Sequence, residues 1–182
     1  MRFSLYQFET GVQTTYDNGV VYDVENDVAH FGAATVEEHA LLWQLDDGAE
    51  EAEGALISRQ IQLDPVADWV MRCDRIEFPP GGIAYTHTHP GPGIRYLLHG
   101  RLDVRTEGHS SSYERGGVWF ESGPEPVLAT ASEQLPTAFV RVLILPAEWA
   151  GKRTIRYVDP ADEERPKLQK PTVYLECPLV LR

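Results

Sequence analysis

One stretch of the sequence carries residue types that could do chemistry. Residues 81–100 read GGIAYTHTHPGPGIRYLLHG, with His87 and His89 one residue apart. On a β-strand, side chains two residues apart point to the same face, so both imidazoles would face one side of a sheet. Imidazole nitrogen is a common ligand of divalent transition metals, and protein sites for such metals usually have three or four ligands. The spacing therefore predicts two metal ligands, and the other ligands must come from elsewhere in the chain.

The elements that would position these histidines are expected to be short strands. Runs of apolar, β-branched and aromatic residues predict strands at 54–63, 69–78, 94–98, 102–106, 118–120 and 137–145. Glycine and proline clusters separate the runs, which is typical of tight turns. Short strands joined in this way indicate an all-β sandwich or barrel rather than a parallel α/β sheet.

The remaining segments give weaker patterns. Residues 35–43 fit either a helix or, from residue 41 onward, a strand, and residues 146–149 predict one short helical turn. The acidic segment 46–53 is predicted as a solvated loop, and the charged segment 159–170 as a surface linker. The apolar segment 172–181 that follows would pair with a sheet of its own chain or with a sheet of a partner.

Composition excludes several classes of partner. The chain has 182 residues, a net charge of −12 and two cysteines without a Cys-x-x-Cys pairing. A chain this acidic lacks the clustered Lys and Arg that bind nucleic acid. Neither the first residues, MRFSLYQFETG, nor any later run is apolar enough for a signal peptide or a membrane span. We therefore expect a cytoplasmic protein that binds neither nucleic acid nor membrane.

The histidine stretch resembles the first motif of the cupin superfamily. In that motif a glycine is followed by five residues and then by His-x-His, a glutamate comes next, and a second glycine closes the motif. Here Gly81, His87, His89 and Gly100 match it, and the segment 116–126 resembles the second cupin motif. The resemblance covers roughly residues 66–146 and implies a jelly-roll barrel, the double-stranded β-helix.

The resemblance also implies how the rest of the chain is organised. We expect an N-terminal β extension over residues 1–60 that packs on the barrel, a cupin core over 61–150, and a C-terminal linker and strand over 151–182. Together these would form a single domain. We also expect a homodimer, because the terminal strands offer edges that need to be covered.

Two positions depart from the cupin motifs. Gly93 stands where the first motif has its glutamate ligand, and Pro126 stands where the second motif has its histidine ligand. Two of the four usual ligands are therefore absent. Glu121 and Glu125 are the candidates to replace them, since carboxylate oxygen also binds transition metals.

Other polar residues of the stretch suggest a site for a small anion. Strand alternation places Arg95 on the inner face, where its guanidinium would bind a carboxylate or phosphate. Tyr85 shares the face of the histidines, and His99 ends the same apolar run as Arg95, so either is a candidate acid or base. Arg141 would pair with Glu121 inside the barrel or lie on its outer face.

Two functions are consistent with these residues. The first is a metal-dependent enzyme of cupin type that acts on a small, anionic molecule by isomerase, lyase or dioxygenase chemistry. Its cofactor would be a divalent transition metal (iron, manganese, nickel, zinc or copper), held by His87 and His89 with a third ligand from Glu121, Glu125 or water. The second is a metal-free binding module for a small anionic ligand.

Overall fold

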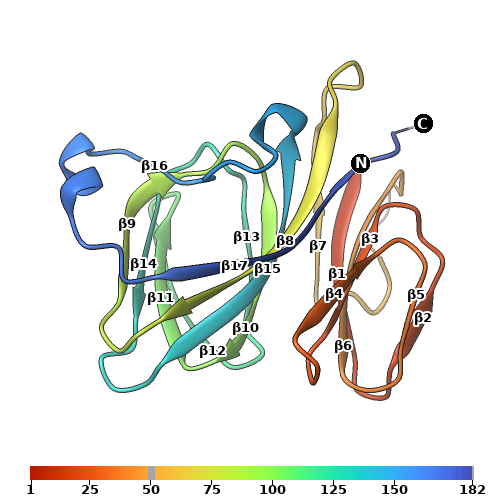
Figure 1. The fold of residues 1–182 in the computed structure, drawn as a ribbon, viewed down its shortest axis with the longest axis horizontal. Coiled ribbons are helices and arrows are strands. Elements are labelled where there is room, and N and C mark those ends of the chain that lie inside the picture. The colour runs from red at the N-terminus through yellow and green to blue at the C-terminus, as the bar shows by residue number, and fades with distance from the viewer. Residues whose placement is uncertain (49–51, 182) are drawn as a thin grey trace. The chain divides into compact units, whose positions relative to one another are not determined.

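A computed structural model describes residues 1–48 and 52–181, and it confirms the prediction of an all-β fold (Figure 1). The chain divides into two compact units. The first unit comprises Met1–Cys73, Val142–Ala150 and Tyr174–Arg182, and the second comprises Asp74–Arg141 and Gly151–Val173. No helix in the described part of the chain is both long and apolar enough to cross a bilayer.

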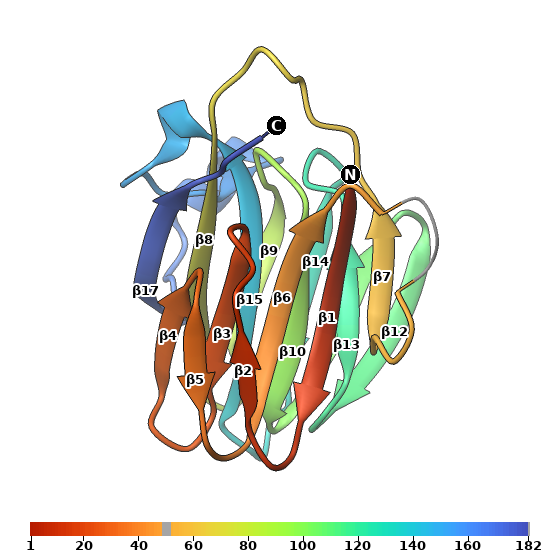
Figure 2. The same ribbon diagram turned by 90° about the vertical axis from the view of Figure 1, so that its right-hand side faces the viewer.

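The first unit is built on a five-stranded sheet of order β4-β3-β6-β1-β7. Its strands are β1 (Arg2–Phe8), β3 (Gly19–Asp23), β4 (Val28–Phe31), β6 (Ala40–Asp46) and β7 (Ile57–Gln60). A two-stranded pair, β2 (Val12–Thr14) and β5 (Ala34–Val36), lies over one face of this sheet (Figure 2). Apolar side chains of the pair pack with those of the sheet: Val12, Ala34 and Val36 against Val21, Ala40 and Leu42.

The helix considered for residues 35–43 is wrong, and the alternative of a strand is confirmed. β6 lies between β3 and β1, and the first six of its seven residues are buried. A central strand is covered on both faces, so its sequence is continuously apolar rather than alternating. Such a run cannot be distinguished from a buried helix by periodicity alone.

The second unit contains the histidine stretch. One sheet has the order β12-β11-β14-β9-β16, with β9 (Ile83–Thr88), β11 (Arg101–Thr106), β12 (His109–Glu114), β14 (Val127–Ala131) and β16 (Arg156–Tyr157). Strands β10 (Gly93–His99) and β13 (Val118–Glu121) face this sheet (Figure 1). The core between them is apolar and includes Leu97, Leu102, Val104, Trp119, Val127 and Phe139.

Three further strands complete a sheet of order β13-β10-β15-β8-β17. β8 (Trp69–Phe78) and β15 (Thr137–Pro146) agree with the predicted ranges, and β17 (Lys170–Pro178) shows that the apolar C-terminal segment pairs within its own chain. Two 3-10 turns, η1 (Ala147–Trp149) and η2 (Pro160–Glu164), occupy the predicted turn and part of the predicted linker. Of the predicted acidic loop, residues 49–51 lie outside the described residues.

Candidate functional site

The two histidines of the motif are buried together in the second unit. His87 is on β9 and His89 follows its end, with 5% and 3% of their surface exposed. Their Nε2 atoms are 3.2 Å apart, and their ring planes are nearly perpendicular, at 84°. The prediction that both imidazoles point to one face is confirmed.

Backbone carbonyls fix which nitrogen of each ring carries the hydrogen. His87 Nδ1 lies 2.7 Å from the carbonyl oxygen of Tyr85, and His89 Nδ1 lies 3.2 Å from that of Thr154. A carbonyl only accepts hydrogen bonds, so each Nδ1 is the donor. Burial lowers the pKa of His87, and it holds the pKa of His89 well below the usual range, so both rings are neutral near pH 7. Two Nε2 lone pairs therefore face each other across 3.2 Å.

Glu121 brings a carboxylate to the histidine pair from β13. Its Oε2 lies 3.7 Å from His89 Nε2, and its Oε1 accepts a hydrogen bond of 2.8 Å from the indole Nε1 of Trp119. Glu121 and Trp119 are both buried, as strand alternation predicts for residues two apart. Glu121 is thus held by a neighbour on its own strand and directed toward His89.

Arg95 supplies a buried cation beside Glu121. The side chain has no exposed surface, and its Nη2 forms an ion pair of 2.6 Å with Glu121 Oε2. Nη1 donates to the carbonyl oxygen of Gly93 at 2.6 Å, whereas Nε and Nη2 make no aligned hydrogen bond within residues 1–48 and 52–181. Burial lowers the pKa of Arg95 to about 10, although Glu121 opposes this effect, so the guanidinium stays charged at neutral pH. The prediction that Arg95 lies inside is confirmed.

Arg141 and Asp74 form a second buried ion pair, which the sequence analysis does not predict. Arg141 on β15 donates from Nε to Asp74 Oδ1 at 2.6 Å and from Nη2 to Asp74 Oδ2 at 3.2 Å. Its Nη1 lies 3.3 Å from His89 Nε2. Arg141 is therefore inside, but its carboxylate partner is Asp74 and not Glu121. A cue existed in the sequence, because Asp74 shares a strand face with Ile76 and Phe78, which are both in the core.

The charges of this buried cluster cancel. Arg95 and Arg141 carry two positive charges, and Asp74 and Glu121 carry two negative charges. Each ion pair is at least nine-tenths buried. Buried ions cost free energy unless they are paired and hydrogen-bonded, and pairing here satisfies most of the charged atoms.

The structure does not bring every predicted residue to this cluster. Tyr85 is half-buried, with its ring 4.9 Å from the guanidinium of Arg165. His99 is exposed at the end of β10, where its Nδ1 lies 3.2 Å from the carbonyl oxygen of Pro136. Glu125 is exposed in the turn after β13. The predicted residues that meet are His87, His89, Glu121 and Arg95.

The residues around His87 and His89 fit a divalent metal in part. Two nitrogens 3.2 Å apart suit two ligands of one ion at roughly 2.0–2.1 Å, with an angle of about 100° between them. Glu121 has the right chemistry for a third ligand, but its two oxygens are held by Trp119 and Arg95. Accordingly, no group of three or more His, Cys, Asp or Glu side chains within the described ranges is arranged as a metal cluster.

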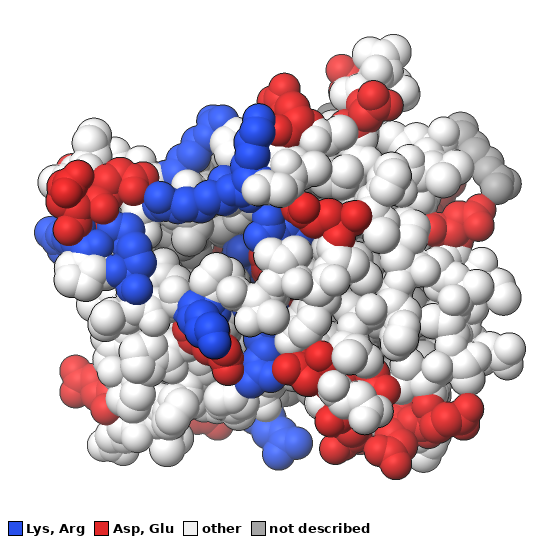
Figure 3. Space-filling view, in the orientation of Figure 1, with Lys and Arg blue, Asp and Glu red and all other residues white. Residues whose placement is uncertain are grey.

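A basic segment runs beside the histidine strand. β16 pairs with β9, with Arg156 opposite Thr88 and Tyr157 opposite His87. Lys152, Arg153 and Arg156 are exposed in this segment. Figure 3 shows Lys and Arg side chains gathered over β16 and the residues that lead to it. In a chain with a net charge of −12, this is a local region of positive charge.

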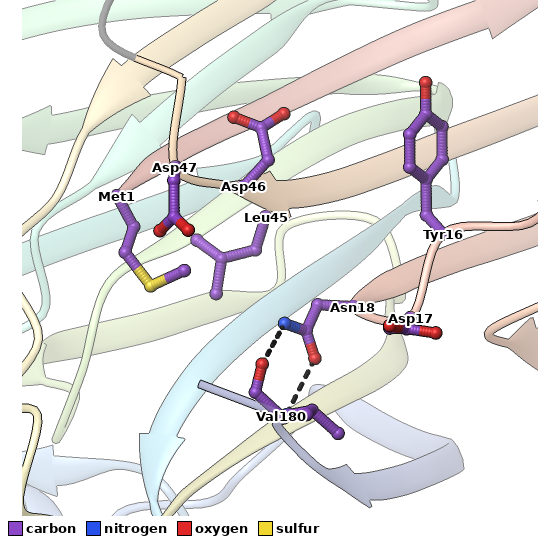
Figure 4. Close-up of a pocket in the computed structure, with 8 residues that line it drawn as sticks. All are labelled: Met1, Tyr16, Asp17, Asn18, Leu45, Asp46, Asp47 and Val180. Carbon is purple, nitrogen blue, oxygen red and sulfur yellow. Dashed lines mark hydrogen bonds between the residues drawn. The ribbon is translucent and has the colours of Figure 1, made fainter. Parts of the chain in front are cut away.

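A separate cavity of about 180 Å³ lies in the first unit. Asn18 lines it and holds Val180 through two hydrogen bonds, of 2.8 and 2.9 Å (Figure 4). Three acidic residues line it as well: Asp17, Asp46 and Asp47. The carboxylate of Asp46 already accepts hydrogen bonds from Gln44 and from the backbone of Gly48. The contacts of this cavity hold the C-terminal segment in place, and they do not form a reactive cluster.

Comparisons with known proteins find similarity to solved structures. An RmlC-like cupin from Shewanella frigidimarina is 18% identical over 43% of this chain and 68% of its own, with a TM-score of 0.39. The DMSP lyase DddQ from Ruegeria pomeroyi is 20% identical over 50% of this chain and 44% of its own, with a TM-score of 0.43. The polyketide cyclase RemF from Streptomyces resistomycificus is 19% identical over 57% and 72%, with a TM-score of 0.40.

These likenesses are too distant to transfer an activity. No family model matches the sequence, and no curated protein matches it. His87 and His89 lie on and directly after a strand that faces β10 and β13 across an apolar core. In this motif and this all-β fold, the chain resembles the cupin superfamily.

Proposed function

We propose that this protein is a metal-dependent enzyme of cupin type that acts on a small anionic molecule. The observation that carries the proposal is the pair of Nε2 lone pairs of His87 and His89, which face each other at 3.2 Å. Two lone pairs at this distance repel each other, and the guanidinium of Arg141 contacts only that of His89, at 3.3 Å, so a cation bound by both nitrogens would remove the repulsion. A divalent transition metal is the cation that two neutral imidazoles bind well.

His87 and His89 would hold the metal, and Glu121 is the described carboxylate nearest to them. A divalent metal bound there would polarise an oxygen of the substrate, which assists isomerisation, elimination and oxygen-dependent chemistry alike. Arg95 would bind the substrate's negative charge through its planar guanidinium.

The preference for an anion follows from the charges. The buried ion pairs Arg95–Glu121 and Arg141–Asp74 are neutral together, so a divalent metal would add two positive charges to a buried region. An anionic ligand that enters with the metal reduces this excess. The basic segment with Lys152, Arg153 and Arg156 would also attract an anionic ligand from solution.

Elemental analysis of protein purified without chelator or affinity tag tests the proposal. About one transition-metal ion per chain is expected in the unaltered protein. The double variant His87→Ala/His89→Ala should lose it while keeping its circular dichroism spectrum. His109→Ala is the matched control, since His109 is exposed on β12 and should leave the metal content unchanged. Full metal content in the double variant, or a protein that stays empty after incubation with each metal, would contradict the proposal.

A second candidate function is metal-free binding of a small anion. It is favoured by Arg95, whose Nε makes no hydrogen bond in the described structure although the residue is fully buried; its Nη2 already lies 2.6 Å from Glu121 Oε2. Buried donors normally have acceptors, and a carboxylate oxygen would supply one. In this case anions should raise the melting temperature of chelator-treated protein, and Arg95→Met should remove the effect. If the anions act only when metal is added, this second function is excluded.

A further inference from the structure

Arg141 Nη1 lies within hydrogen-bond distance of His89 Nε2, which carries the only lone pair of that ring. Asp74 binds the guanidinium through two oxygens, at 2.6 and 3.2 Å, and this leaves Nη1 directed at His89 Nε2, 3.3 Å away. Asp74 has no exposed surface and Arg141 is 5% exposed, so the pair is held inside the second unit. The position of Nη1 is therefore set by a buried ion pair and not by a mobile surface side chain.

An imidazole with its hydrogen on Nδ1 has a single lone pair, on Nε2. The carbonyl of Thr154 holds His89 in this form. Its lone pair can accept a hydrogen bond from Arg141 or bind a metal, but it cannot do both. His87 differs, because its Nε2 faces only the lone pair of His89 among the contacts described.

We propose that Arg141 is an internal competitor of the metal, which covers His89 until a metal displaces it and then offers Nη1 to the anionic ligand. This inference rests on the proposed function, since it assumes that His87 and His89 bind metal. It makes Arg141 a positioning residue with two alternative partners. It also gives a role to a charged pair that is buried against a histidine.

The affinity for Zn²⁺ alone, measured by competition with a chelating dye on metal-free full-length protein, tests this. The first variant is Asp74→Asn/Arg141→Gln, which keeps the net charge of the cluster and replaces the ion pair by two amides. The second is Arg141→Lys, whose single ammonium can stay with Asp74 but cannot also reach His89. Both variants should bind Zn²⁺ about tenfold more tightly than the unaltered protein, the scale of an ordinary coupling between sites.

The outcomes separate the two proposals. Tighter Zn²⁺ binding in either folded variant supports competition by Arg141, and His109→Ala should leave the affinity unchanged. Equal or weaker binding in the folded variants, with clear binding by the unaltered protein, overturns the inference and leaves the proposed function standing. If the unaltered protein and both variants all fail to bind Zn²⁺, the inference and the proposed metal site fall together. Arg141→Lys carries the test alone if the double variant does not fold.

Discussion

Glu121 lies directly opposite Gly93 across the antiparallel pair of β10 and β13. Residues opposite each other in such a pair point to the same face of the sheet. The cupin motif would carry a glutamate at position 93, and here the carboxylate comes from the neighbouring strand instead. Because Gly93 has no side chain, only the carboxylate of Glu121 occupies this face at that pair of positions.

The first prediction concerns the position of the buried carboxylate, at residue 121 rather than at residue 93. Gly93→Glu would place two buried carboxylates opposite each other, and we expect it to lower the free energy of unfolding by about 1–3 kcal/mol in metal-free protein. Moving the carboxylate with Gly93→Glu/Glu121→Gly should recover most of the loss. Urea unfolding at pH 7 with chelator present measures both. If Gly93→Glu alone is as stable as the unaltered protein, positions 93 and 121 do not compete for one space.

The second prediction concerns the buried pair of Arg95 and Glu121. Arg95→Met leaves the carboxylate buried without a cation, and the expected loss of stability is about 3–5 kcal/mol. Arg95→Met/Glu121→Gln removes both charges and should regain a large part of that loss. Arg101→Met is the matched control: Arg101 pairs with Asp103 at 3.7 Å on the surface, and its loss should cost less than about 1 kcal/mol. Equal effects of Arg95→Met and Arg101→Met would contradict the buried pair.

The third prediction concerns the indole of Trp119, which donates to Glu121. Trp119→Phe retains an aromatic ring but removes a hydrogen bond to a charged acceptor, with an expected cost of about 1.5–3 kcal/mol. Trp69→Phe is the comparison, because Trp69 donates to a neutral carbonyl, that of Asp64, and should lose only about 0.5–1.5 kcal/mol. The hypothesis requires Trp119→Phe to have a much smaller effect in a Glu121→Gln background, which thermal unfolding of the double variant checks.

The fourth prediction concerns pH. Burial lowers the pKa of His87 and of His89 in the folded protein, so the folded state binds fewer protons than the unfolded chain at mildly acidic pH. Stability is thus fully present above the unfolded pKa of about 6.5, and it is lost as the pH falls toward the folded pKa values. Each histidine can contribute up to about 1.4 kcal/mol per pH unit.

Urea unfolding of chelator-treated protein between pH 7 and pH 5 measures this slope. His87→Gln/His89→Gln should flatten it, whereas His109→Gln should leave it as in the unaltered protein. The charged groups that face the two rings are Arg95, Arg141 and Glu121. An unchanged slope in the His87→Gln/His89→Gln variant would show that the two rings are not the groups that titrate.

The sequence predicts strands best where local rules decide the structure. The sequence predicts β8 and β15 with nearly their observed bounds, since each is a ten-residue segment rich in apolar residues with a proline at or directly after its end. β12 (His109–Glu114) shows the opposite case. It is polar and exposed along most of its length, and its pairing with β11 holds it extended. A strand without an apolar face leaves no periodic signal.

In the candidate site too, local sequence rules predict some features, and tertiary packing decides the others. The common face of His87 and His89 and the inward position of Arg95 follow from strand alternation, and both are confirmed. The partner of Arg141 could not be deduced in this way, because Asp74 is 67 residues away in sequence and meets it only through tertiary packing. The alternation of side chains along a strand predicts which face a charged residue occupies, but it does not predict which residue of opposite charge pairs with it.

The division of the chain into units bears on how the protein is made. The first unit consists of three separate segments, and the last of them begins at Tyr174. When only Met1–Cys73 has been synthesised, the other two segments of this unit, Val142–Ala150 and Tyr174–Arg182, have not yet been translated. The second unit also needs Gly151–Val173, which includes the β16 partner of the histidine strand. The five-stranded sheet of the first unit is complete by Gln60, whereas the later segments of both units pair with residues far away in sequence, and closing such distant pairings makes folding slow.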